Sequence, residues 1–315
     1  MNYPKNIVIC EVGLRDGLQN ESKILTVEEK VTLVDMLTNA GFSTVEVGSF
    51  VSPKAVPQMA NTDDVYKKIH KKAGIEYRSL IANARGVDRA IACGCTKVKL
   101  NVSASKAHNL ANLNKTPAES VAGFQECVHK AKDNTIGISG SVSMAFGSPW
   151  DKKIPLEDVK DIVDAYLKVG ITEISLSDAS GMAFPSQVFE ICTEMKKVYP
   201  QVRWWLHFHN TRGLGIANII AGMQAGFTHF DTSFAGVGGC PFVPGAAGNV
   251  STEDVLHMCE EMEIKTAIDL DKMIIISKKI VKIIGHATDS YLLRAGKSKD
   301  LIREIPTGQI KNQVK

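Results

Sequence analysis

The chain has 315 residues, 44% of them hydrophobic, which is enough for two ordinary domains or for one large α/β barrel. Its 37 Lys and Arg residues against 34 Asp and Glu leave a formal net charge of only +3, which argues against a nucleic-acid partner. The seven cysteines follow no disulfide spacing and indicate a reducing, cytoplasmic location, and no stretch has the pattern of a secretion signal or a membrane span.

Strand-like runs rich in β-branched residues alternate with helix-like segments along the chain. The eight runs are 7–12, 43–49, 77–82, 97–103, 137–146, 173–178, 203–209 and 229–236. The clearest helical segments between them are 26–41, 116–132, 155–170 and 185–200. Because repeated β/α units close into a parallel barrel, the pattern predicts the α/β class and a (β/α)8 TIM barrel.

Two features mark where helices begin and where the barrel ends. Thr26 with Glu29, and Thr116 with Glu119, have the spacing of a capping box. Beyond the eighth unit, the apolar segment 268–285 predicts an additional helix. We therefore expect a catalytic barrel over 1–265 and a helical extension with a tail over 266–315, and the extra apolar helices favour a homo-oligomer such as a dimer.

Polar residues stand where several predicted strands end. In a TIM barrel, active-site residues come from the carboxyl ends of the strands and the loops that follow them. Scattered positions would therefore meet at one mouth of the barrel. The candidates are Arg15, Asp16, Glu46, Ser49, Asp178, His207, His209, Cys240 and Asn249.

The pair His207 and His209 has strand spacing, so both imidazoles point to the same side. Such a pair is either a metal site or two hydrogen-bonded sheet histidines. Asp16 and Asn249 add a carboxylate and an amide oxygen, and this mixed set favours a catalytic divalent cation with positions open for substrate.

Three further charged residues each allow two interpretations. Arg15 either pairs with a carboxylate or faces negative charge that develops on the substrate. Glu46, an acid in an apolar strand, is either its partner or a catalytic acid. Asp178 either orients the histidines or contacts the ligand.

A glycine-rich loop carries one thiol, Cys240, in the stretch GVGGCPFVPGAAGNVSTED at 236–254. Glycines permit backbone conformations closed to other residues, so the loop is typical of a lid that folds over a substrate. The alternative is a loop around a buried, inert cysteine.

Five motifs carry a resemblance to a known family: EVGLRDGLQNE from Glu11, SFVSP from Ser49, SMAFGSP from Ser143, HFHNTRG from His207 and the cysteine loop. With them the chain resembles the 3-hydroxy-3-methylglutaryl-CoA lyases, within the metal-dependent barrel lyases and Claisen-type synthases. The similarity runs from about residue 10 to about residue 267, nearly the whole barrel.

The resemblance implies a role for most of the candidates. Asp16, His207, His209 and Asn249 would hold a divalent cation, Mg²⁺ or Mn²⁺. Arg15 would stabilise an enolate, and Cys240 would transfer a proton. Family positions near the substrate or the metal are also matched by Gln19, Ser49, Glu46 and Asp178.

The chain departs from the family pattern at two motifs, one of which is the turn Ala179-Ser180-Gly181 after Asp178, where the family usually has Thr-Ile-Gly. Family members commonly have His-x-His-Asp-Thr-Tyr-Gly where this chain has HFHNTRG at 207–213. An acid has become an amide, and a phenol has become Arg212, which raises the local potential and favours an anionic group nearby. We therefore expect Arg212 to bind substrate.

The implied reaction is retro-Claisen cleavage of a 3-hydroxy-3-methylglutaryl-CoA-like thioester to acetyl-CoA and a keto acid. The alternatives are a lyase for a related acyl-CoA such as citramalyl-CoA, a synthase that condenses acetyl-CoA with a keto acid, and a non-catalytic metal-binding scaffold. For each of the enzymatic alternatives we expect an acyl-CoA as the partner, and we expect neither a nucleic acid nor a membrane as a partner.

Overall fold

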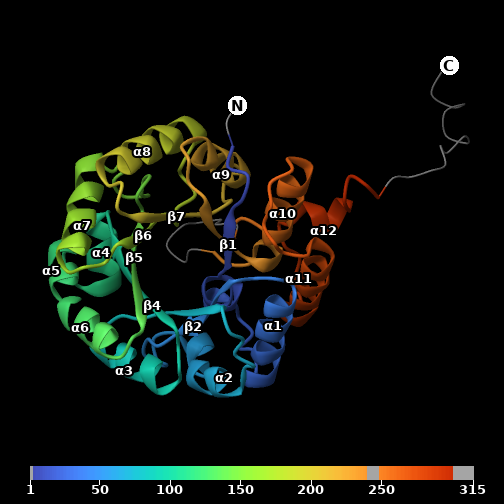
Figure 1. The fold of residues 1–315 in the computed structure, drawn as a ribbon, viewed down its shortest axis with the longest axis horizontal. Helices are drawn as coiled ribbons and strands as arrows, with labels where there is room; N and C mark the ends of the chain where they lie inside the picture. Colours follow the sequence, from blue (N-terminus) through green and yellow to red (C-terminus); the bar gives the residue numbers. More distant parts are fainter. Residues whose placement is uncertain (1–2, 240–247, 301–315) are drawn as a thin grey trace, which may run out of the picture.

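A computed structural model describes residues 3–239 and 248–300 as a closed barrel of parallel strands inside a ring of helices (Figure 1). Each strand pairs with the next, and the last pairs with the first, so the expected TIM barrel is confirmed. The strands are β1 (Val8–Glu11), β2 (Thr44–Ser49), β3 (Glu76–Leu80), β4 (Lys97–Ser103), β5 (Gly137–Ser143), β6 (Glu173–Asp178), β7 (Arg203–Phe208) and β8 (His229–Thr232).

Helices connect the strands and cover the outside of the barrel (Figure 1). Between strands lie α1 (Val27–Asn39), α2 (Thr62–Lys68), α3 (Ala84–Ala92), α4 (Lys106–Leu113), α5 (Pro117–Ala122), α6 (Gln125–Asp133), α7 (Leu156–Lys168), α8 (Pro185–Val198) and α9 (Gly215–Gln224). After β8 follow α10 (Thr252–Glu261), α11 (Leu270–Ile284) and α12 (Tyr291–Ala295). In the described part of the chain, no helix is both long and apolar enough to cross a membrane.

The single helix expected over 116–132 is wrong, because the structure divides it into α5 and α6 at Gly123 and Phe124. Glycine is a poor helix former, so the break falls where propensity is lowest. The two short helices also pack on different neighbours, α5 on α7 and α6 on α3. The capping boxes Thr26–Glu29 and Thr116–Glu119 are both present.

The extra C-terminal helix α11 packs against α1 and α10 (Figure 1). It buries Met273, Ile276 and Ile280 in the same hydrophobic core as the barrel helices. Its Ser277 hydroxyl donates to Glu253 of α10 at 2.7 Å. The division of the chain at residue 265 stays a prediction.

A buried lysine on α1 makes the stability of the fold depend on pH. The Lys30 ammonium is almost fully buried and donates to the Gln58 carbonyl at 2.5 Å and to the Asn61 amide oxygen at 2.7 Å. Both acceptors are neutral, and burial lowers the pKa of Lys30 to about 8.

Because the unfolded chain binds this proton more tightly than the folded chain does, folding becomes more favourable as pH rises from about 8 to the ordinary lysine pKa. Relative to Lys30→Met, we expect the wild-type free energy of unfolding to rise by about 3 kcal/mol across that window, at about 1.4 kcal/mol per pKa unit. Urea unfolding of both proteins across the window measures it. Parallel pH profiles would contradict the prediction.

Candidate active site

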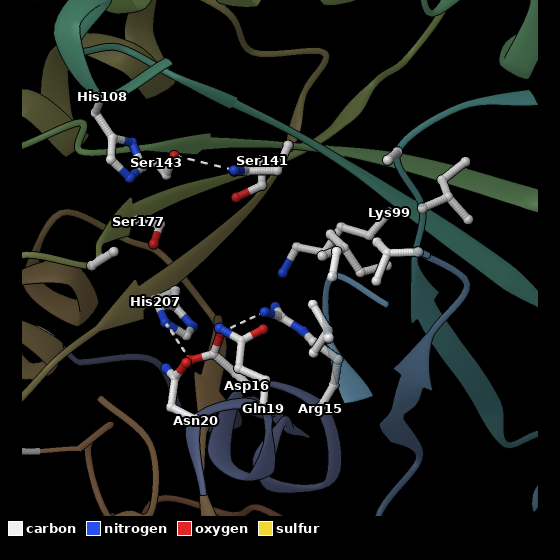
Figure 2. A pocket seen from close by; sticks show the side chains of 18 of the residues that line it. Arg15, Asp16, Gln19, Asn20, Lys99, His108, Ser141, Ser143, Ser177 and His207 are labelled. Carbon is white, nitrogen blue, oxygen red and sulfur yellow. Dashed lines mark hydrogen bonds and ion pairs between the residues drawn. The ribbon is translucent and has the colours of Figure 1, made fainter. Parts of the chain in front are cut away.

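One tight turn directly after β1 presents the first two charged residues of the site. Gly13–Gly17 forms a short π-helical turn, in which the backbone N–H groups of Arg15 and Asp16 both donate to the Val12 carbonyl, at 3.0 and 2.8 Å. Single π turns are common at functional sites. The turn directs both side chains into the barrel mouth, where they line the same cavity (Figure 2).

The two histidines come from the end of β7 and reach the same carboxylate. Asp16 Oδ2 lies 3.7 Å from His207 Nε2 and 3.6 Å from His209 Nε2. One ligand atom from each of these three residues lies within 4.8 Å of the others. This spacing fits a shared cation.

Asn249 enters from the far end of the glycine-rich loop and pairs with His209 through an isolated β-bridge. Its Nδ2 donates to Asp16 Oδ2 at 2.9 Å and to the Val237 carbonyl at 3.1 Å. Among the described residues, the buried Asn249 Oδ1 and His209 Nδ1 have no hydrogen-bond partner. Two imidazoles, a carboxylate and an unsatisfied amide oxygen fit a divalent cation.

A residue that the sequence analysis did not select, Asp231 on β8, lies behind His207. Its Oδ2 is 3.4 Å from His207 Nδ1 and 2.9 Å from the Lys99 ammonium. Burial opposes ionisation here, but Lys99 and His207 hold the pKa of Asp231 well below its ordinary value. A carboxylate on Nδ1 leaves Nε2 of His207 for a metal.

Asp231→Asn should weaken Mn²⁺ binding by about 10- to 100-fold, because an amide holds the His207 ring less firmly. Calorimetric titration of the metal-free protein with Mn²⁺ measures the affinity without any substrate. Glu173→Gln is the matched control. Glu173 is another buried barrel acid, but it lies at the start of β6, at the end of the barrel away from the site, where it pairs with Arg78 and Lys97. Equal affinities for all three proteins would refute the role of Asp231.

Arg15 is held between two carboxylates. Its Nε donates to Glu46 at 2.7 Å and its Nη1 to Asp16 at 2.5 Å. Burial disfavours the charge, but Glu46 and Asp16 outweigh it and raise the pKa of Arg15 above its ordinary value. Burial likewise opposes ionisation of Asp16, and Arg15 and the histidines keep its pKa well below the usual range.

Asp178 is buried and its carboxylate binds the loop that follows β6. It accepts hydrogen bonds from the backbone N–H of Met182 and Ala183, at 2.9 and 3.0 Å, and from the Ser180 hydroxyl at 3.0 Å. Burial raises the pKa of Asp178 to about 6. Its backbone carbonyl accepts the N–H of His209 at 3.3 Å, so it supports the histidine strand from the side.

Gln19 lies in the cavity wall, whereas two other expected substrate contacts lie outside it. Ser49 is buried, and its hydroxyl donates to the Leu80 carbonyl at 3.2 Å. Arg212 is exposed, and its Nη1 donates to the carbonyls of Ser180 and Gly181 at 3.1 and 3.0 Å. Cys240 lies outside the described residues.

The cavity holds about 610 Å³, and Asp16, His207 and His209 lie in its wall (Figure 2). Its lining includes polar residues that the sequence analysis missed: Asn20, Lys99, Asn101, His108, Ser141, Ser143 and Ser177. A signal for those on strands was present, because polar residues alternate with apolar ones in KVKLNVS and GISGSVS. Parallel strands covered by helices usually read as continuous apolar runs, so this alternation indicates a polar barrel interior.

A family model described as HMGL-like matches residues 6–280. The chain belongs to the HMGL-like family. The chain is similar to the hydroxymethylglutaryl-CoA lyase YngG of Bacillus subtilis, which is 38% identical over 95% of this chain and 100% of its own length.

Two further relatives cover nearly the whole chain. A 3-hydroxy-3-isohexenylglutaryl-CoA/hydroxymethylglutaryl-CoA lyase of Pseudomonas aeruginosa is 35% identical over 94% of this chain and 98% of its own length. An HMG-CoA lyase from Acinetobacter baumannii, solved in complex with coenzyme A and 3-methylmalate, has a TM-score of 0.91 and 42% identity, covering 97% of this chain and 100% of that one.

Proposed function

We propose that this chain is a metal-dependent carbon–carbon lyase that cleaves 3-hydroxy-3-methylglutaryl-CoA to acetyl-CoA and acetoacetate. The observation that carries the proposal is the meeting of Arg15, Asp16, His207 and His209 at one cavity in a chain whose relatives over nearly full length are HMG-CoA lyases. These relatives favour cleavage over the condensing synthase and over a non-catalytic scaffold.

The reaction breaks one carbon–carbon bond and moves one proton. The C3 hydroxyl loses its proton, its oxygen becomes a ketone, and the C2–C3 bond breaks. The electron pair of that bond goes to the thioester as an enolate, and protonation at C2 gives acetyl-CoA. The remaining fragment is acetoacetate, so no oxidant or reductant is needed.

Asp16, His207, His209 and Asn249 would hold the cation, for which we propose Mg²⁺ or Mn²⁺. When bound, a divalent cation supplies positive charge that acidifies the C3 hydroxyl and polarises the forming ketone. The chain itself supplies the second positive centre, the Arg15 guanidinium, which Glu46 holds in the cavity wall. Cys240 stays our candidate for the proton donor to C2, on the sequence alone.

The charges around the cavity support an anionic substrate. Arg15 and Lys99 contribute two positive charges, and Asp16, Glu46 and Asp231 contribute three negative ones. With a divalent cation the cluster has one positive charge in excess, which the free carboxylate of the substrate would neutralise. Buried charges are stable only when they are compensated in this way.

The direct test is incubation of the purified protein with Mn²⁺ or Mg²⁺ and HMG-CoA, followed by chromatography of the products. We expect acetyl-CoA and acetoacetate in equal amounts. Formation of neither product, or net condensation of acetyl-CoA with a keto acid, would refute the lyase. An acyl-CoA partner, a cytoplasmic location and a homo-oligomer complete the proposal.

A further inference from the structure

The inner face of β5 and β6 carries small side chains where a barrel normally carries large ones. Ser139, Ser141 and Ser143 alternate on β5, and Ser175 and Ser177 on β6. In TIM barrels, bulky branched side chains usually fill the interior. Here Ser141, Ser143 and Ser177 line the cavity instead, so substrate space extends along this side of the barrel.

The polar residues on this side form one continuous row, which we call the serine wall: Asn101, Ser141, Ser143 and Ser177. Asn101 is the register partner of Ser141 across β4 and β5. At the other end, Ser177 is the register partner of the metal-site residue His207. In Figure 2 the row can be followed from Ser143 past Ser177 to His207.

Several hydrogen-bonding groups of the serine wall have no partner among the described residues. Asn101 Nδ2 donates to Ser143 Oγ at 3.2 Å. Among the described residues, no hydrogen bond occupies the hydroxyls of Ser141 and Ser177 or the Asn101 amide oxygen, although all three residues line the cavity. A polar group that loses water to a ligand without gaining a partner costs free energy, so a ligand here must offer hydrogen bonds.

The rest of the cavity is already suited to the other parts of the substrate. Arg15, and the divalent cation that Asp16, His207, His209 and Asn249 would hold, suit the C3 oxygen, the carboxylate and the thioester oxygen. The loops after β2 and β3 contribute apolar side chains to the cavity wall, among them Val51, Val56 and Ile81, which suit the alkyl part of a pantetheine arm. The serine wall is left for the fourth group on C3.

We propose that the serine wall binds the C3 substituent of the thioester and that the preferred substrate carries there a hydrogen-bonding oxygen, not a bare methyl group. This inference rests on the proposed lyase activity and names its substrate class: 3-hydroxyglutaryl-CoA thioesters with an oxygenated C3 side chain. Variation at this position has a parallel in the family, where the Pseudomonas aeruginosa relative is named for both an isohexenyl and a methyl substituent.

The test compares two thioesters of equal size, 3-hydroxy-3-ethylglutaryl-CoA and 3-hydroxy-3-(hydroxymethyl)glutaryl-CoA, with HMG-CoA as reference. We expect kcat/KM for the hydroxymethyl compound to exceed that for the ethyl compound by about tenfold, the size of one well-placed hydrogen bond.

Variants of the wall locate the effect. Ser141→Ala removes one hydroxyl without adding volume and should cut the hydroxymethyl preference at least about threefold. Ser141→Val fills the space and should lower kcat/KM for both larger compounds more than for HMG-CoA. Ser139→Ala is the matched control, because Ser139 lies on the same strand face, one step below the cavity, and donates to the Val98 carbonyl at 3.5 Å.

The outcomes separate this inference from the proposed function. If HMG-CoA is cleaved but the ethyl and hydroxymethyl compounds react equally, the inference is overturned and the lyase stands. If Ser141→Ala lowers kcat/KM by the same factor for every thioester, the wall contacts a part that all substrates share, which also overturns it. If no thioester is cleaved at all, both proposals fail.

Discussion

Arg15→Met is expected to lower kcat by about 10³, the loss seen when one preorganised charge donor is removed from an active site. The guanidinium lines the cavity next to Asp16, and the carboxylates of Glu46 and Asp16 keep it charged. Negative charge develops on the thioester oxygen only as the C2–C3 bond breaks. The loss should therefore appear in kcat, measured as the rate of acetyl-CoA release, with little change in KM.

Two further substitutions make this result specific. Arg15→Lys keeps the charge but cannot make both the 2.7 Å contact with Glu46 and the 2.5 Å contact with Asp16, so it should recover only part of the activity. Arg203→Met removes an exposed arginine at the other end of the barrel and should retain full activity. An Arg15→Met protein with near-normal kcat would exclude Arg15 from enolate stabilisation.

His207→Ala should weaken Mn²⁺ binding by more than about 100-fold, because loss of a direct ligand exceeds the effect of losing a residue behind it. Turnover should vanish in the same variant and in wild-type protein treated with a chelator, and added Mn²⁺ should restore only the wild type. Calorimetric titration of the metal-free proteins gives the affinities independently of turnover.

His70→Ala is the control for the histidine substitution. The side chain of His70 is 84% exposed and lies beside Asp35 on the outside of the barrel, so Mn²⁺ affinity should not change. If His207→Ala bound Mn²⁺ as tightly as wild type, the shared-cation site would be refuted even with the barrel intact.

The sequence analysis found the residues whose chemistry stands out in their local surroundings. Asp16 and Arg15 follow a strand, and His207 and His209 have strand spacing, so elementary periodicity places them at one end of a barrel. It missed Asp231, whose carboxylate lies 3.4 Å from His207. An acid within one strand gives no indication of which neighbouring strand it faces until the register is known.

The contacts of Glu46 and Arg212 also could not be determined from the sequence. The sequence left Glu46 as either a catalytic acid or a partner of Arg15, and the structure shows the ion pair at 2.7 Å. Arg212 suggested a substrate contact because it adds a positive charge beside the histidine motif; its guanidinium donates to the carbonyls of the loop after β6, and the substrate contact stays a prediction. Proximity along the chain does not determine where a long, flexible side chain ends.

The barrel, its order of strands and the candidate cation ligands could be predicted from local pattern, because periodicity and residue type are properties of short segments. The shape and polarity of the substrate space could not. They arise where β4, β5, β6 and β7 lie side by side and bring Asn101, Ser141 and Ser177 of the serine wall into line with His207. Contacts between residues far apart in the chain depend on strand register, and only the folded barrel sets that register.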